Sequence, residues 1–261
     1  MPISVVGYSL RFQTLTEAQV LASYAKLQKM GFDGVEGVSF RGWSEDEWFD
    51  KLNEYGLKTI SIRADFDNLD ATFKRAEKFG VKVFGGPQIG NNTMRSVDGF
   101  KAHAAELNKI AAPLKGTGYK IQYHNHAQEF RNFPEIGYKT GMQILIEETD
   151  PEVVAFEIDT HWVTAGGADP VEWVNKVAGR IPVIHFKDYG INYKEANVGL
   201  GYVSKTFAEI GNGNINWPPI VEAAKKAGVE WYSIEQDECP GDPFDSLKMS
   251  IDFMRGKLGI V

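Results

Sequence analysis

Short apolar runs recur along the chain, and each follows a stretch with helical periodicity. The runs lie near residues 3–8, 33–38, 57–62, 81–85, 119–125, 153–159, 182–187 and 231–236. Each is short enough for a strand buried on both faces, as the strands of parallel sheets are. The pattern therefore predicts eight parallel strands joined by helical crossovers.

A glycine marks the passage from helix to strand at five places. These are Gly31, Gly56, Gly80, Gly118 and Gly228, each just before an apolar run. Glycine fits the left-handed residue that ends many helices. Helix starts are predicted from the capping-box spacing of Thr14 with Glu17 and of Ser44 with Glu47.

Eight such units in 261 residues, with no change of composition between halves, favour an α/β fold of one domain over residues 1–261, a (β/α)8 TIM barrel. A doubly wound open sheet is the alternative, but no Gly-x-Gly-x-x-Gly follows the first strand. One long insertion, residues 189–216, is rich in Gly, Asn and Tyr and precedes a helix predicted at 218–226. We expect a loop there that covers a substrate.

The balance of charges limits the partners. The formal net charge is -7, and acidic residues alternate with Lys and Arg along the chain. We therefore expect neither nucleic acid nor a membrane surface as a partner. A single cysteine, Cys239, and no sign of a secretory leader predict a cytoplasmic protein.

Paired polar residues close four successive predicted strands. The strand ends read His124-Asn125-His126, Glu157-Ile158-Asp159, His185-Phe186-Lys187 and Glu235-Gln236-Asp237. The outer two residues of each triplet share a face, and barrel enzymes place their catalytic groups at these ends. A single pair is explained by a solvated loop start or a satisfied hydrogen bond. Four pairs at one barrel mouth are costly unless they bind a cation.

A divalent metal ion would offset that cost. Imidazole nitrogen combined with carboxylate oxygen suits Zn, Mn or Co better than Mg or Ca, and these strand ends contain no sulfur ligand. The residues leave the choice among Zn, Mn and Co open.

Five motifs extend this pattern over nearly the whole chain. They are Tyr-His-Asn-His with Glu-Phe at 123–130, Ile-Asp-Thr-His-Trp at 158–162, Gly-Arg-Ile at 179–181 before His-Phe-Lys-Asp at 185–188, Gly-Asn-Gly-Asn-Ile-Asn-Trp at 211–217 and Tyr-Ser-Ile-Glu-Gln-Asp at 232–237. With them the chain resembles the sugar phosphate isomerase/epimerase family, the xylose isomerase-like barrels that include tagatose 3-epimerase, inosose isomerase, inosose dehydratase and endonuclease IV. The resemblance implies a homodimer or homotetramer acting on a small sugar or polyol.

The resemblance also implies four metal ligands. Asp159, His185 and Glu235 match three of them. Many relatives carry Glu as the fourth, on the fifth strand, where this chain offers Gln122, His124 and His126. His124 matches best in position and facing. The change puts a symmetrical mechanism with two glutamates in doubt.

Such a metal could chelate a carbonyl and its neighbouring hydroxyl and ease removal of the proton between them, which gives an enediolate. We expect a metal-dependent isomerase or epimerase acting on a keto-sugar or polyol. An inosose dehydratase or keto-glycoside lyase that uses the same metal is the alternative.

All these reactions need a general base. His126 and His161 are the candidates, with Glu235 as a third, because the pKa of histidine lies near neutrality. Either histidine could instead support a ligand or stack on a ring. Lys187 could neutralise a developing oxyanion or pair with Glu157.

Three further residues are expected to contact substrate. For Glu36 the resemblance implies a substrate hydroxyl or a contact that supports a ligand. Trp162 could present its ring face to a sugar, although core packing also explains a tryptophan. Arg63 is a candidate cation for a phosphate, but the sequence contains no phosphate-binding loop, so we expect an unphosphorylated substrate.

Two other classes of function are alternatives. Endonuclease-like cleavage of DNA would need more His and Asp ligands and a basic surface, which five histidines and a net charge of -7 disfavour. A non-catalytic sugar-binding barrel is the third class, because the fifth-strand Glu is missing.

Overall fold

The computed structural model of the chain describes residues 1–90, 92–192 and 204–260. The chain divides into two compact units. Unit 1 comprises residues 1–59, 185–222 and 230–261, and unit 2 comprises residues 60–184 and 223–229. Strand β9 (Val183–Phe186) and helix α8 (Trp217–Ala227) each contribute residues to both units. One domain over residues 1–261 stays a prediction.

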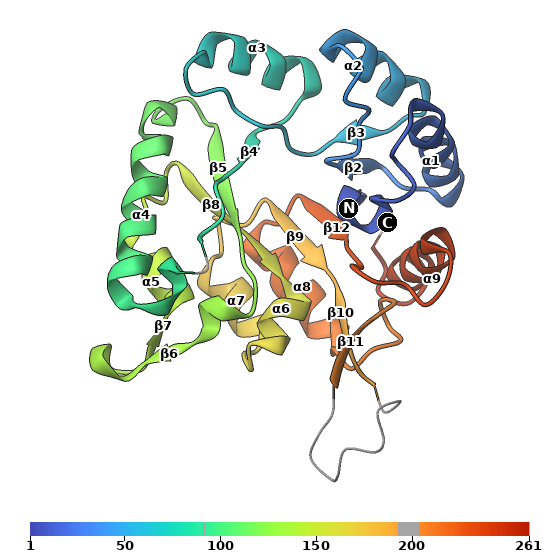
Figure 1. The fold of residues 1–261 in the computed structure, drawn as a ribbon. Coiled ribbons are helices and arrows are strands. Elements are labelled where there is room, and N and C mark those ends of the chain that lie inside the picture. Colours follow the sequence, from blue (N-terminus) through green and yellow to red (C-terminus); the bar gives the residue numbers. More distant parts are fainter. Residues whose placement is uncertain (91, 193–203, 261) are drawn as a thin grey trace. The chain divides into compact units, whose positions relative to one another are not determined.

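Eight strands are hydrogen-bonded in the order β3-β2-β1-β12-β9-β8-β5-β4 and are labelled in Figure 1. Apart from β3 and β4, which stand at the two ends of this order, strands that are consecutive among the eight along the chain are neighbours. Ile62, just beyond β3, forms a parallel bridge to Phe84 of β4 and links the two ends of that order. This is the strand order of a (β/α)8 barrel, and it confirms the predicted fold class. All eight predicted strands are present.

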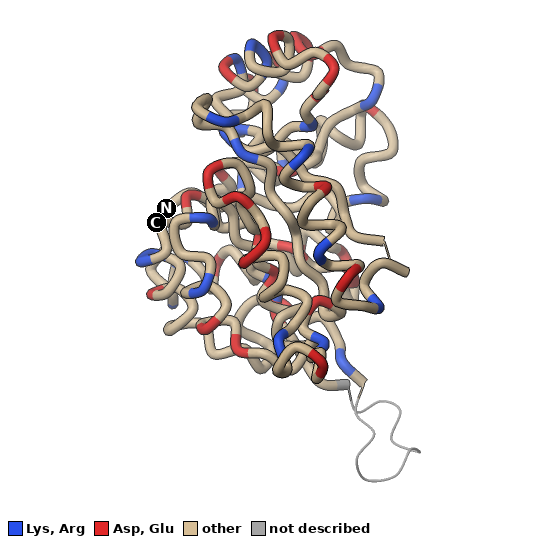
Figure 2. The backbone as a smooth tube through the Cα atoms, turned by 90° about the vertical axis from the view of Figure 1, so that its left-hand side faces the viewer, with Lys and Arg blue, Asp and Glu red and all other residues tan. Residues whose placement is uncertain are grey.

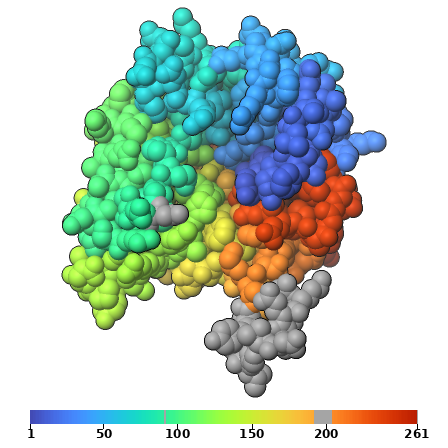
Figure 3. All heavy atoms as spheres, viewed as in Figure 1, coloured from blue at the N-terminus to red at the C-terminus, as the bar shows by residue number. Residues whose placement is uncertain are grey.

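Unit 1 carries the first three strands and the last one. Its elements are β1 (Ile3–Val6), α1 (Glu17–Met30), β2 (Gly34–Glu36), α2 (Glu45–Glu54), β3 (Lys58–Thr59), β10 (Asp188–Asn192), β11 (Ser204–Ala208), β12 (Trp231–Ile234) and α9 (Pro243–Gly256). Helix α9, near the red end of the chain, lies beside α1, near the blue end (Figure 3). Arg255 of α9 pairs with Asp33, 3.3 Å away, and so joins the two ends of the sequence.

Unit 2 carries the middle strands. Its elements are α3 (Leu69–Phe79), β4 (Val83–Gly85), α4 (Val97–Ala111), β5 (Lys120–His124), β6 (Asn132–Phe133), β7 (Lys139–Thr140), α5 (Gly141–Glu148), β8 (Val154–Asp159), α6 (Thr160–Ala165) and α7 (Pro170–Lys176). Every residue of β8 is buried, which is why this strand reads as a nearly continuous apolar run in the sequence.

The predicted helix ends are confirmed at four of the five glycines, whereas the fifth, Gly118, lies four residues beyond the 3-10 turn that follows α4. All five residues have positive φ, for example 86° at Gly31 and 67° at Gly80, a conformation that costs glycine little. The Ser44–Glu47 capping box is confirmed. The Thr14–Glu17 prediction is wrong, because Thr16 and Gln19 form the box while the Thr14 hydroxyl donates to the Leu10 carbonyl.

The long insertion differs from a simple loop. Its described ends are the strands β10 and β11, which pair antiparallel from Asp188–Ala208 to Asn192–Ser204. Residues 193–203 of the predicted loop lie outside the described residues. The helix predicted at 218–226 is α8, one residue longer at each end.

Acidic and basic residues alternate along the tube in Figure 2. This agrees with the mixed charge pattern of the sequence. Among the described helices, none has both the length and the apolar character needed to cross a membrane.

Candidate functional site

Asp159 marks the end of β8 and the start of α6. Its Oδ1 accepts a hydrogen bond from the Trp162 backbone N–H at 2.9 Å, so the carboxylate caps the helix that follows. The side chain is fully buried. Strand and cap together fix the carboxylate of Asp159, one of the predicted metal ligands.

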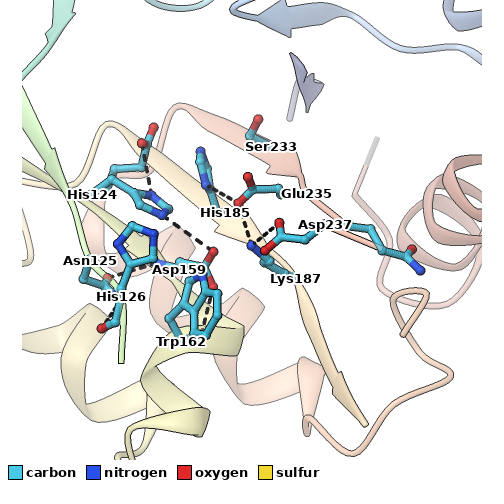
Figure 4. A network of polar contacts seen from close by, with 12 residues as sticks. His124, Asn125, His126, Asp159, Trp162, His185, Lys187, Ser233, Glu235 and Asp237 are labelled. Atoms are coloured by element: carbon cyan, nitrogen blue, oxygen red, sulfur yellow. Dashed lines mark hydrogen bonds and ion pairs between the residues drawn. The ribbon is translucent and has the colours of Figure 1, made fainter. Parts of the chain in front are cut away.

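His124 of β5 lies between two carboxylates of β8 in unit 2 (Figure 4). Its Nδ1 is 3.4 Å from Glu157 Oε2, and its Nε2 is 3.9 Å from Asp159 Oδ2. Gln122 holds the other Glu157 oxygen, because its amide donates to Oε1 at 2.7 Å. Among the fifth-strand candidates, His124 thus has a ring nitrogen that faces Asp159.

The two candidate bases of unit 2 differ in burial. The His126 ring is partly exposed and lies with its centroid 5.0 Å from that of His124 and 5.5 Å from that of Trp162. The His161 ring is fully buried, 4.9 Å from Trp162. A substrate can reach His126 more readily. Trp162 contacts both imidazoles.

His185 of β9 also lies between two carboxylates, in unit 1. Its Nδ1 is 3.2 Å from Glu235 Oε2, and its Nε2 is 3.1 Å from Glu36 Oε2. Both distances are in hydrogen-bonding range. That Glu36 supports a ligand or contacts a substrate hydroxyl stays a prediction.

Lys187 is buried and joins two of the eighth-strand residues. Its Nζ lies 3.0 Å from Glu235 Oε2 and 2.6 Å from Asp237 Oδ1 (Figure 4). Burial raises the pKa of the Asp237 carboxyl, although the Lys187 charge acts in the opposite direction. The buried ammonium is compensated in place by two carboxylates.

Two residues that organise these clusters received no role from the sequence. The buried Asn125 accepts the Asp159 backbone N–H at 3.1 Å, which ties β5 to β8. The buried Asp188 accepts the Gly211 N–H and the Trp217 indole N–H, both at 2.8 Å. Polar residues at the ends of apolar runs were the available signal, but their partners are distant in sequence.

Arg63, the predicted phosphate contact, has an exposed side chain in unit 2. Its backbone carbonyl accepts a hydrogen bond from the Arg75 guanidinium. A role in binding substrate stays a prediction.

The donor atoms fit a borderline divalent metal ion. The predicted ligands include two pairs of an imidazole and a carboxylate, namely His124 with Asp159 and His185 with Glu235. In the unit 2 pair, the 3.9 Å separation is too long for a hydrogen bond between the two side chains. Nitrogen and oxygen donors of this kind suit Zn, Mn or Co.

Comparison with known families gives one match over most of the chain. A family model described as xylose isomerase-like TIM barrel matches residues 24–257. Among curated proteins, an inosose dehydratase from Geobacillus thermodenitrificans is 29% identical over 165 residues, which cover 59% of this chain and 53% of that protein. The match thus spans about half the length of that relative.

Solved structures show the same fold at low sequence identity. A sugar phosphate isomerase/epimerase from Parabacteroides distasonis has a TM-score of 0.73 and 22% identity, over 98% of this chain and 94% of that one. The IOLI protein with a bound zinc atom has a TM-score of 0.66 and 13% identity, over 99% and 98% of the two chains.

Proposed function

Because the chain belongs to the xylose isomerase-like TIM barrel family, we propose that it is a metal-dependent lyase that removes water from a keto-polyol of the inosose class. The observation that carries this proposal is the imidazole of His124 between Glu157 and Asp159. It stands where an epimerase with two opposed glutamates needs a carboxylate. The name of the sequence relative, inosose dehydratase, supports the same reaction.

We propose that His124, Asp159, His185 and Glu235 hold the ion together. Their strands β5, β8, β9 and β12 are consecutive in the sheet order, and barrels of this family gather the carboxyl ends of their strands at one mouth. A zinc ion bound to a structural neighbour supports the choice of a divalent cation, and Mn and Co fit the same donors. When bound, the ion supplies Lewis-acid polarisation of the substrate carbonyl.

Dehydration needs a base beside the carbonyl and a proton for the departing hydroxyl. His126 is the proposed base, because its ring is partly exposed beside His124 and Trp162. It takes the proton from the carbon next to the carbonyl, a carbon–carbon double bond forms, and the β-hydroxyl leaves as water. The Lys187 ammonium is the proposed donor of the proton that the leaving hydroxyl takes up, and Glu235 positions that ammonium through their 3.0 Å ion pair.

An isomerase or epimerase that acts on a keto-sugar through the same proton removal is the second candidate. Glu235 favours it, because a carboxylate held by Lys187 and His185 could return the proton to carbon. The substrate would then keep all its oxygen atoms.

Incubation in deuterated water separates these reactions. We expect an inosose to lose water in the presence of the metal-loaded protein. Incorporation of deuterium without loss of water, from an inosose or a keto-sugar, would identify the isomerase or epimerase instead. Protein that binds polyols but retains no metal would indicate the non-catalytic barrel.

Substitutions assign the roles. His126→Gln should keep the metal and lose most of the turnover, whereas Asp159→Ala should lose both. His103→Gln is the matched control, because His103 is a buried histidine of α4 that contacts Glu106. Full turnover in His126→Gln would contradict the assigned base.

A further inference from the structure

Glu157 is a buried carboxylate of β8 for which the proposed reaction has no direct use. Its side chain is 6% exposed. It is the register partner of His124 on the neighbouring strand β5. A carboxylate in such a place is costly unless its oxygens meet hydrogen-bond donors. The neighbours of its two oxygens therefore indicate what it does.

Gln122 fixes the orientation of the Glu157 carboxylate. The buried Gln122 amide donates to Oε1 at 2.7 Å. With Oε1 held in this way, Oε2 lies 3.4 Å from His124 Nδ1, close enough for an electrostatic contact although the two atoms form no hydrogen bond in this geometry. Gln122, Glu157 and His124 thus form an ordered series across two strands of unit 2.

The chemistry of the carboxylate then determines the form of the imidazole. An ionised carboxylate can only accept a hydrogen bond, so its negative charge favours a hydrogen on the imidazole nitrogen nearest to it, which is Nδ1 of His124. A neutral imidazole has one N–H group, and a hydrogen on Nδ1 leaves the lone pair on Nε2. In His124 that Nε2 is the nitrogen on the side of Asp159 Oδ2, 3.9 Å away.

We propose that Glu157, held by Gln122, is a positioning residue that keeps His124 in the Nδ1–H tautomer and so makes Nε2 the metal-binding atom. The inference rests on the proposed function to the extent that His124 is a ligand. Carboxylates that accept the second N–H of a ligand histidine fix its tautomer and ring orientation. In this chain, the neighbouring strand supplies that carboxylate.

Glu157→Gln tests the proposal because it should reverse the tautomer of His124. Gln122 still donates to position 157, so the amide oxygen of the new side chain should take the place of Oε1 and its NH2 group should face Nδ1. A donor there favours hydrogen on Nε2 instead. We expect ¹⁵N spectra of the metal-free protein to show the Nδ1–H tautomer in the parent chain and the Nε2–H tautomer in Glu157→Gln. The ¹⁵N signals of His124 are identified as those that are missing from the spectrum of His124→Gln.

Metal binding provides a second readout. In competition with a chromophoric chelator, Glu157→Gln should bind Zn²⁺ about 10–100-fold more weakly than the parent chain, the usual effect of removing such a partner. Glu147→Gln is the matched control. Glu147 is an exposed residue of α5 whose partner is Lys139, so neither its tautomer signal nor its zinc affinity should change.

The outcomes are distinguishable. An unchanged tautomer and an unchanged zinc affinity in Glu157→Gln would overturn the positioning role. A parent chain that binds no zinc would contradict the proposed function, while the tautomer measurement would still decide the role of Glu157. If Glu157→Gln does not fold, Gln122→Ala replaces it. That variant keeps the carboxylate but loses its anchor, and a tautomer population and zinc affinity equal to those of the parent would overturn the proposal.

Discussion

His124 in unit 2 and His185 in unit 1 each lie between two carboxylates, but the two arrangements differ in how firmly they are held. His185 is within hydrogen-bonding distance of both partners, at 3.2 Å and 3.1 Å. The corresponding distances from His124 are 3.4 Å and 3.9 Å. Lys187 adds a buried positive charge to the His185 cluster, whereas the amide of Gln122 is the partner of Glu157 in the other.

The difference suggests two tasks. In unit 1, charges of opposite sign are compensated within the cluster, so Glu235 is held in place by protein groups. In unit 2, the wider spacing at His124 and Asp159 fits two ligands that an ion draws together. Glu36 contacts Nε2 of His185, the ring nitrogen opposite the one near Glu235. In the same way, Glu157 contacts Nδ1 of His124, the nitrogen opposite the one near Asp159.

The largest effect is expected from removing the buried ammonium. Lys187→Met leaves Glu235 and Asp237 as partly compensated buried carboxylates and should lower the free energy of unfolding by about 3–5 kcal/mol. Urea denaturation of the protein in the presence of a metal chelator measures this change in the free energy of unfolding. Lys176→Met is the control, because the Lys176–Glu172 pair is solvent-accessible and should contribute about 1 kcal/mol or less. Equal effects of both variants would contradict the difference between the clusters.

Metal removal probes both clusters together. An ion at 100 times its Kd should raise the free energy of unfolding by about 2.7 kcal/mol, and a chelator should reverse this. The gain should disappear in His124→Ala and in His185→Ala. Retention of the full gain in either variant would show that one cluster binds the ion alone.

Two buried tyrosines allow a comparison of the strands that carry the clusters. On β5 the Tyr123 hydroxyl donates to the fully buried Glu129 at 2.7 Å. On β12 the Tyr232 hydroxyl has no hydrogen-bond partner among the described residues. Tyr123→Phe should therefore cost about 1.5–3 kcal/mol of unfolding free energy, and Tyr232→Phe much less. Thermal unfolding of both variants and of the parent chain measures the two losses. A larger loss in Tyr232→Phe than in Tyr123→Phe would contradict the prediction.

The smallest effect is expected at alkaline pH. Burial raises the pKa of Tyr232 to about 12. A raised pKa in the folded state gives stability that is complete below the unfolded pKa, near 10, and is lost as the pH rises toward 12. Tyr232→Phe should lose less stability than the parent chain between pH 10 and pH 11. Chemical denaturation at each pH measures both stabilities. An equal loss of stability in the variant and in the parent chain would show that the pKa of Tyr232 is not raised.

The fold was largely predictable because its signals are local. Gly31 and Gly80 end helices by a conformation that glycine adopts readily, and the apolar runs gave all eight strands. Thr14 and Thr16 both satisfy the capping-box spacing, and only the bond from Thr14 to the Leu10 carbonyl decides between them. The Gly- and Asn-rich segment after β9 gave no alternation from which β10 and β11 could be predicted.

The sequence indicated which polar residues lie at the strand ends, but not their contacts. Asp159, His185 and Glu235 were proposed as ligands from those places and from the family resemblance, and that role stays a prediction. That Glu157 faces His124 depends on the register of β5 against β8, which pairs residues 33 positions apart. The partners of Lys187 and Asp188 depend in the same way on elements far along the chain.

The most direct test is X-ray absorption spectroscopy of the zinc-loaded protein. We expect one zinc per chain with two imidazole ligands and the rest oxygen, and one imidazole fewer in His124→Gln. A single imidazole in the parent chain, or a spectrum that is unchanged in His124→Gln, would contradict a metal held by His124, Asp159, His185 and Glu235.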